Sequence, residues 1–139
     1  MADTRRRRGL VDTSVVIDLG RVDADALPAE IAISAITLAE LAAGPHATAD
    51  PAERARRQDR LQRTESTFGA LPVDAAVARA YGRIYAAVVA AGRKARGRRA
   101  FDLLIAATAL AGELPLYTCN PGDFSELDGL VEVVAVPTP

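Results

Sequence analysis

Short runs of aliphatic and β-branched residues alternate along this chain with stretches whose apolar residues repeat at helical spacing. Parallel strands cannot be joined by a tight turn and need a crossover, which is usually a helix. The alternation therefore favours an α/β fold. We expect one domain with a central parallel sheet of four or five short strands, covered by helices. The expected strands are residues 9–11, 31–36, 115–120 and 130–136, with 72–73 as a short fifth.

The helices between these strands are predicted from their start signals and apolar stripes. Asp50-Pro51-Ala52-Glu53 is a strong start, because Asp is a good N-cap and Pro fits the first helical position. Two later stretches have apolar residues three and four apart, which indicates amphipathic helices. The expected helices are residues 37–43, 51–68, 74–92 and 99–112.

Length and composition exclude several classes of protein. The 139 residues suffice for one domain with its own core, and the formal net charge of −1 gives no field over the whole molecule. One Cys and one His exclude an internal disulfide, a Cys-based zinc site and catalysis by paired histidines. No apolar run is long enough to span a membrane. Asp12 and Asp18 interrupt the segment that resembles a signal peptide, so we expect a cytoplasmic protein.

The first residues differ in composition from the rest. Residues 5–8 are four consecutive Arg. We expect residues 1–8 to be a basic, mobile tail and residues 9–139 to form the folded domain.

Asp12 lies inside the apolar run "GLVDTSVVIDLG", which otherwise has the pattern of a buried strand. A buried carboxylate is normally paired, neutralised or bound to a metal. Glu40, Asp102 and Asp123 also fall near expected strand ends, where open parallel sheets place their functional crevice. Clustered carboxylates repel one another unless a cation lies among them, and oxygen-only ligands suit Mg²⁺ or Mn²⁺. The four acids therefore indicate a metal site.

Each acid also has a purely structural explanation. "TLAE", residues 37–40, fits a capping box in which Glu40 bonds back to the start of its helix. Asp102 can complement a helix dipole, and Asp123 can begin a helix in "DFSE". Asp12 is a good N-cap for a helix that starts at Thr13. On spacing alone, both explanations stay open.

Four segments together resemble the PIN-domain ribonucleases, and specifically the VapC-type toxins of VapBC toxin–antitoxin pairs. They occur in family-like order and spacing over nearly the whole chain. The segments are "LVDTSVVIDL" (10–19), "ISAITLAELAAG" (33–44), "RRAFDLLIAATAL" (98–110) and "LYTCNPGDFSEL" (116–127).

The resemblance implies an endoribonuclease that depends on Mg²⁺, with Mn²⁺ as an alternative. The family's motif acids correspond to Asp12, Glu40 and Asp102, of which Asp12 and Asp102 are the expected direct ligands. Glu40 is expected to orient or deprotonate the attacking water. Members often carry an acid where this chain has Asn120, so Asp123 is expected to assist at the fourth position. Thr13, Ser14 and Thr118 either anchor waters or only cap and shape the backbone.

The basic run "RKARGRR", residues 93–99, precedes Asp102 and has five basic residues in seven. Arg98 and Arg99 are candidate contacts to RNA phosphates, although a solvated run of charge explains the same pattern. A phospho-acceptor signalling domain is disfavoured, because Lys94 is the only Lys and is misplaced for that class. A catalytically weak or inactive RNA-binding or scaffold protein with the same fold remains the alternative function.

The resemblance also implies partners. We expect a cognate VapB-type antitoxin, a toxin homodimer and a toxin–antitoxin hetero-oligomer. A basic residue of the antitoxin is expected to enter the acidic pocket. Its apolar side chains are expected to fill a groove between the helix that carries Glu40 and the polar helix after Asp50.

Overall fold

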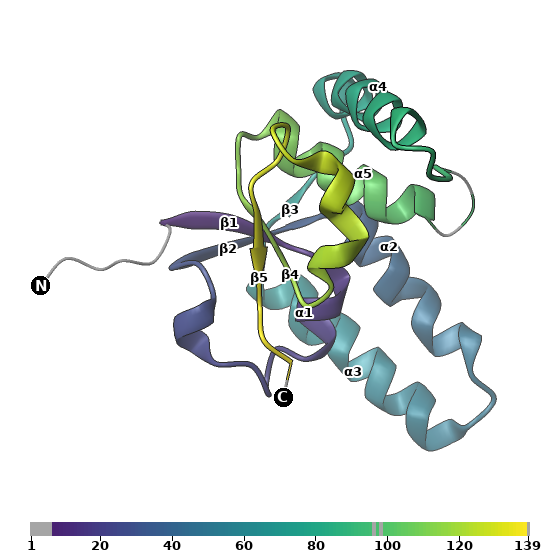
Figure 1. Cartoon of the computed structure of the whole chain (residues 1–139). Coiled ribbons are helices and arrows are strands. Elements are labelled where there is room, and N and C mark those ends of the chain that lie inside the picture. The colour runs from purple at the N-terminus through teal and green to yellow at the C-terminus, as the bar shows by residue number, and fades with distance from the viewer. Residues whose placement is uncertain (1–6, 96, 98, 139) are drawn as a thin grey trace, which may run out of the picture.

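The computed structural model describes residues 7–95, 97 and 99–138, and over this part of the chain it contains one five-stranded sheet in the order β3-β2-β1-β4-β5 (Figure 1). All four strand pairings are parallel. The predicted α/β fold is therefore confirmed. The strands are β1 (Arg8–Val11), β2 (Glu30–Ser34), β3 (Ala70–Leu71), β4 (Leu116–Thr118) and β5 (Val133–Ala135).

Helices connect the strands, and the predicted starts at Asp50 and Asp74 are confirmed. The side chains of these two residues accept hydrogen bonds from the backbone N–H groups of Ala52 and Val77, as N-caps do. The helices are α1 (Thr13–Ile17), α2 (Ala35–Ala43), α3 (Pro51–Thr67), α4 (Ala75–Ala90) and α5 (Arg99–Ala111), with 3₁₀ segments η1 (Ala24–Ala26), η2 (Gly44–Ala47) and η3 (Pro121–Leu127). Among the described residues, the structure contains no helix with the length and apolarity to cross a membrane.

Several boundaries differ from the sequence-based prediction. Helix α2 begins at Ala35 instead of residue 37, because Ser34 ends β2 and its hydroxyl accepts a hydrogen bond from the Ile36 N–H at 3.0 Å. Strand β3 ends directly before Pro72, two residues earlier than the expected strand at 72–73, because Pro has no N–H to donate to a ladder. Strand β1 starts at Arg8, one residue before the expected domain start, and the expected tail at residues 1–6 lies outside the described residues.

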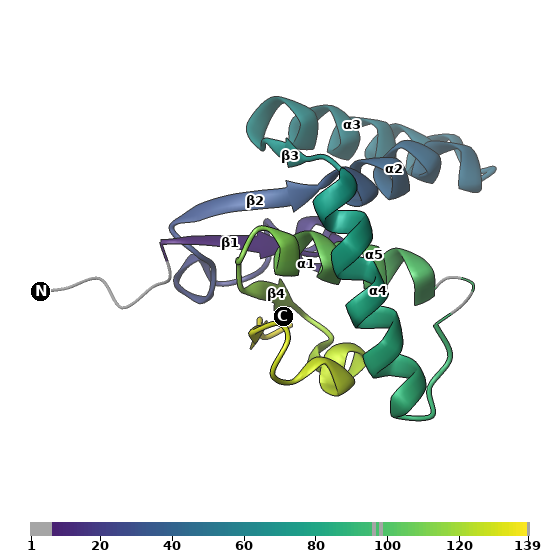
Figure 2. The ribbon, with the colours of Figure 1, turned by 90° about the horizontal axis from the view of Figure 1, so that it is seen from above.

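Side chains of successive strand residues enter two separate cores, one on each face of the sheet. Leu10, Ala32 and Leu116 pack with residues of α4, α5 and η3. The next residue of each strand packs on the opposite face, with residues of α1 and α2. Figure 2 shows α2 beside α3 and α4 crossing α5. This three-layer arrangement explains why the short strands are apolar on both faces.

Strand β1 lies at the centre of the sheet and is its topological switch point. The chain proceeds from β1 to β2 and β3 on one side, and later to β4 and β5 on the other. In open parallel sheets, the crevice at such a point lies beyond the carboxyl ends of the strands. Asp12 directly follows β1 at this edge, and Asn120 and Asp123 follow β4.

Gly9 in β1 is required by the ring of Tyr117 in β4. A Cβ atom at Gly9 would lie 2.5 Å from Tyr117 Cε1 and 3.1 Å from Pro28 Cγ. Tyr117 is 4% exposed, so its ring has little room to move away. We predict that Gly9→Ala lowers the free energy of unfolding by about 1–3 kcal/mol, the usual cost of overpacking a core.

Urea denaturation measures this effect directly. Gly20→Ala is the matched control, because a Cβ atom at Gly20 would meet nothing within 4 Å. A Gly9→Ala variant as stable as the wild type would show that the ring does not need this space.

Candidate active site

Asp12 is placed at the end of β1 by the start of helix α1. Its side chain is the N-cap of α1, and Oδ1 accepts a hydrogen bond from the Val15 N–H at 3.2 Å. The hydroxyl of Ser14 donates to the same oxygen at 2.5 Å, and the Thr118 side chain also bonds to the carboxylate. Asp12 is only 6% exposed. The N-cap explanation and the buried-acid explanation are thus both correct for this residue.

The charge on Asp12 reflects two opposing effects. Burial raises the pKa of this carboxyl group above its ordinary value, and the hydrogen bonds from Ser14, Thr118 and Val15 act in the opposite direction. The Asp12 N–H also donates to the Tyr117 carbonyl at 3.0 Å, which continues the β1–β4 ladder. Asp12 is therefore a buried acid with a fixed orientation and with its pKa raised by burial.

Ser14 joins α1 to the end of β4. Its hydroxyl accepts a hydrogen bond from the Cys119 N–H at 3.2 Å while it donates to Asp12. Thr118, the last residue of β4, is fully buried. Both hydroxyl residues contact the Asp12 carboxylate directly, which is a more specific role than backbone shaping.

Glu40 is held by a chain of hydroxyl groups between α1 and α2. The Thr13 hydroxyl donates to Glu40 Oε1 at 2.7 Å and lies 3.0 Å from the Thr37 hydroxyl. A hydroxyl group has one proton to donate, so Thr37 is the donor to Thr13 in this chain. Thr37 was not among the predicted site residues, because the pattern "TLAE" indicated a helix cap at this position.

The capping-box explanation of Glu40 is wrong. The N-cap of α2 is Ser34, so Thr37 lies inside the helix and is fully buried. Glu40 is the sixth residue of α2, beyond the first turn where a capping box closes. Its carboxylate bonds to Thr13 of α1 instead, a contact between residues 27 positions apart.

Asp102, in the first turn of α5, lies within electrostatic reach of the other three acids. Its pKa is raised to about 6, first by burial and then by the negative charges of Glu40, Asp12 and Asp123. The Arg99 guanidinium opposes this rise. The four predicted acids therefore share one electrostatic environment, although they come from four different segments.

Asn120 and Asp123 are the exposed part of this region. Asn120 precedes η3 and makes no side-chain cap bond to it, while its N–H donates to the Thr118 hydroxyl at 3.0 Å. Asp123 lies in the first turn of η3, whose N-cap is Asn120, and directly precedes a kink at Phe124. Its exposed carboxylate faces water and contributes charge to Asp102.

The basic run divides into two parts. Arg98 lies outside the described residues, so its predicted contact with RNA stays a prediction. Arg99 is described, and its guanidinium forms an ion pair with Glu126 of η3, where the two side chains are 16% and 3% exposed. The predicted RNA contact of Arg99 also stays a prediction, but this side chain already has an internal partner.

The donor set fits a hydrated divalent cation. Within residues 7–95, 97 and 99–138, no three His, Cys, Asp or Glu side chains converge into a preformed metal cage. A small divalent cation that keeps several waters needs only one or two carboxylates from the protein. Asp12 and Asp102 supply these, and the remaining groups here are oxygen donors, which suit hard cations.

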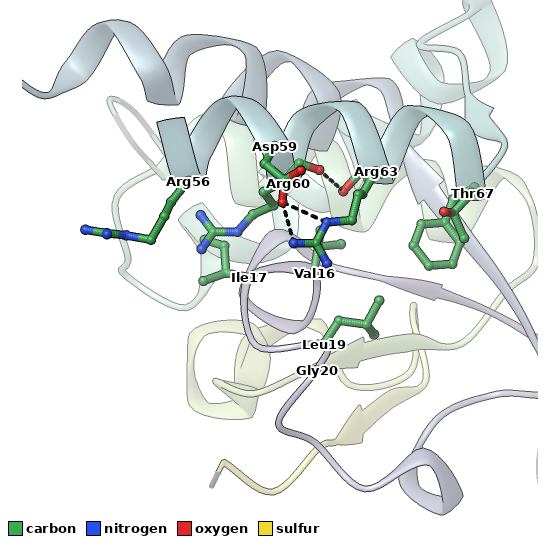
Figure 3. Close-up of a pocket in the computed structure, with 11 residues that line it drawn as sticks. Val16, Ile17, Leu19, Gly20, Arg56, Asp59, Arg60, Arg63 and Thr67 are labelled. Atoms are coloured by element: carbon green, nitrogen blue, oxygen red, sulfur yellow. Dashed lines mark hydrogen bonds and ion pairs between the residues drawn. The ribbon is translucent and has the colours of Figure 1, made fainter. Parts of the chain in front are cut away.

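A second feature lies on the other side of α1. A groove of about 480 Å³ separates the end of α1 from α3 (Figure 3). Val16, Ile17 and Leu19 line one wall, and α3 contributes a charged wall of Arg56, Asp59, Arg60 and Arg63. The groove expected from the sequence lay between α2 and α3; this groove shares α3 with it, but its other wall is the end of α1.

Comparison with known proteins agrees with this geometry. The PIN domain family profile matches residues 9–130. Ribonuclease VapC5 of Mycobacterium tuberculosis (strain ATCC 25618 / H37Rv) is 38% identical over 133 residues, which cover 92% of this chain and 95% of the relative. Ribonuclease VapC8 of the same strain is 42% identical over 103 residues, covering 73% of this chain and 89% of the relative.

Solved structures give the same result. The crystal structure of VapBC-5 from M. tuberculosis, a member of the VapBC family of toxin–antitoxin systems, has a chain that aligns with a TM-score of 0.80 and 36% identity. The match covers 95% of this chain and 99% of that one. FitAcB from Neisseria gonorrhoeae aligns with a TM-score of 0.71 and 29% identity, covering 89% and 94%. The chain therefore belongs to the PIN-domain family.

Proposed function

We propose that this protein is a metal-dependent endoribonuclease that hydrolyses RNA phosphodiester bonds and acts as the toxin of a toxin–antitoxin pair. The observation that carries the proposal is the shared electrostatic environment of Asp12, Glu40, Asp102 and Asp123 at the switch point of the sheet. The similarity to Ribonuclease VapC5 along most of both chains supports the same activity. We also propose that the protein acts in the cytoplasm, on RNA present there.

Mg²⁺ is the metal we assign to the site, with Mn²⁺ as an alternative. PIN-domain ribonucleases are in general dependent on a divalent metal. When bound, such an ion lowers the pKa of a coordinated water and neutralises charge on the phosphate. Asp12 and Asp102 are the residues that hold it. The hydrogen bonds from Ser14 and Val15 aim the Asp12 carboxylate, and a pKa near 6 leaves Asp102 ionised at neutral pH.

Glu40 is the residue that orients or deprotonates the attacking water. Thr13 donates to Oε1 of Glu40, which fixes the carboxylate on the face of α2 that contacts α1. A general base must be held within hydrogen-bond reach of the proton that it takes, and this hydroxyl chain supplies such restraint. Asp123 assists from the exposed edge of the site through water, and Asn120 occupies the fourth motif position without a charge.

We predict that Asp12→Asn and Asp102→Asn each lower the rate of RNA cleavage by more than about 100-fold. Loss of a group that hydrogen-bonds to a metal ligand already costs about 10–100-fold in metal affinity or activity, and each of these variants removes a ligand charge itself. The measurement is cleavage of a labelled RNA in Mg²⁺, with circular dichroism to verify folding.

Asp25→Asn is the matched control, because Asp25 is exposed in η1 and lies outside the site. EDTA must abolish cleavage by the wild type. Cleavage that persists in EDTA, or that Asp102→Asn leaves at the wild-type rate, contradicts the metal assignment. A wild type that binds RNA and never cleaves it supports the inactive RNA-binding or scaffold alternative.

The antitoxin partner is proposed from the similarity to VapBC structures and from the groove between α1 and α3. Ile17 is 47% exposed at this groove, and Arg56, Arg60 and Arg63 outnumber Asp59 on the opposite wall. Apolar side chains flanked by carboxylates complement such a surface. We assign this groove to a segment of a VapB-type antitoxin, whose basic residue enters the acidic site at the other end of α1. A toxin homodimer and a toxin–antitoxin hetero-oligomer are part of this proposal.

We predict that Arg60→Glu weakens the complex with the antitoxin by about 5–50-fold. The new carboxylate on α3 would repel the carboxylates that we expect on the antitoxin segment in the groove. The measurement is a binding isotherm with the cognate VapB-type antitoxin, at low and at high salt. Arg79→Glu on α4 is the control, because Arg79 is exposed and far from the groove lining. Equal affinities for both variants would remove the groove from the proposal.

A further inference from the structure

Glu126 of η3 is a buried carboxylate that the proposed chemistry does not use. Its side chain is 3% exposed and pairs with the Arg99 guanidinium at the start of α5. Arg93 Nη1 lies 3.8 Å from its other oxygen. Burial works against its charge, but a backbone hydrogen bond and the Arg99 guanidinium hold the pKa of Glu126 below its usual range. Glu126 is therefore an ionised group inside the protein.

Packing fixes the guanidinium of Arg99. Its central carbon lies 5.8 Å from the centroid of the Phe124 ring, and Phe124 is 2% exposed. A cation over an aromatic face at this distance is attracted to it. Among the described residues, Arg99 Nε is the one buried side-chain polar atom without a hydrogen-bond partner. The ion pair with Glu126 and the contact with the Phe124 ring together fix the position of the Arg99 guanidinium, although its Nε lacks a hydrogen-bond partner.

The ion pair lies one turn away from the candidate active site on both of its segments. Arg99 precedes Asp102 by three residues in α5, and residues three apart on a helix are neighbours. Glu126 follows Asp123 by three residues in η3. The positive charge of Arg99 already acts on Asp102. Arg99 thus has two acids within its range, Glu126 and Asp102.

We infer that Glu126 is a positioning residue, which holds the Arg99 guanidinium away from Asp102 and thereby leaves the Asp102 carboxylate free for a divalent cation. The inference rests on the proposed function, because it concerns the same metal site. Arg can bind a carboxylate with two parallel hydrogen bonds, so an Arg99 released from Glu126 is a strong competitor for Asp102. In this arrangement, Arg99 is a structural residue whose guanidinium is held by the Glu126 carboxylate.

The decisive variants are Glu126→Gln and the double variant Arg99→Gln/Glu126→Gln. Glu126→Gln removes the charge that retains Arg99, so an Arg99–Asp102 ion pair replaces it. We expect the affinity for Mn²⁺, measured by the electron spin resonance of free Mn²⁺ without RNA, to fall by about 10-fold or more. The double variant removes the competitor as well and is expected to recover most of the wild-type affinity.

Cleavage kinetics separate competition from simple loss of structure. For Glu126→Gln, we expect the Mg²⁺ concentration for half-maximal cleavage to rise, while the rate at saturating Mg²⁺ stays close to that of the wild type. A role confined to stability would lower the rate at every Mg²⁺ concentration. Glu30→Gln is the matched control, because it breaks an exposed Arg8–Glu30 ion pair whose nitrogen and oxygen lie 3.5 Å apart.

Breaking a buried ion pair can unfold a protein, so thermal unfolding is measured for each variant. If Glu126→Gln does not fold, Glu126→Asp is used instead. Asp keeps the negative charge, but its side chain is one methylene shorter and holds Arg99 less firmly. We expect this variant to weaken Mn²⁺ binding partially. Mn²⁺ affinity unchanged in the folded Glu126 variant, or a double variant no better than Glu126→Gln, overturns the inference. A wild type that binds no Mn²⁺ overturns the proposed function instead.

Discussion

The buried carboxylate of Asp12 is the group on which the rest of the site depends. It ends the central strand, begins α1, and binds the hydroxyl groups of Ser14 and Thr118. Through Ser14 it also connects to the backbone at the end of β4. Because β1 is the switch point of the sheet, this one residue links both halves of the fold at the edge where ligands bind.

Around Asp12, the fold places charge in two layers. The inner layer is acidic: burial and the charges of Glu40, Asp12 and Asp123 raise the pKa of Asp102. The outer layer is the ion pair between Arg99, three residues before Asp102 in α5, and Glu126, three residues after Asp123 in η3. An acidic cluster attracts any cation, and the Arg99 guanidinium is a cation whose charge already acts on Asp102. A partner for Arg99 therefore serves both the stability of the fold and the availability of the site.

The sequence predicted the parts of this arrangement that depend on local pattern. Asp12 and Asp102 were placed correctly because strand ends and helix starts have short-range signals, and N-caps such as Asp50 and Asp74 were confirmed for the same reason. The contacts that orient the acids were not predicted. Thr13 meets Glu40, and Arg99 meets Glu126, across 27 residues in each case, and no local pattern marks such pairs. The capping box at Thr37 was wrong because Ser34, three residues before the expected helix start, is the N-cap of α2.

The central claim is that these acids form a binding site for a divalent cation, and the melting temperature of the protein as a function of Mg²⁺ concentration tests it most directly. A ligand that binds only the folded state stabilises it by RT ln(1 + c/Kd), where c is the free ligand concentration, so the Tm rises as c is increased. If Asp12 is a ligand of the cation, we expect the Tm of the wild type at pH 7.5 to rise with Mg²⁺ and that of Asp12→Asn to stay constant. At pH 5, below the pKa of about 6 of Asp102, a proton competes with the cation and the rise is smaller. A wild-type Tm that does not change with Mg²⁺, or an equal rise in Asp12→Asn, would contradict a cation site at these acids.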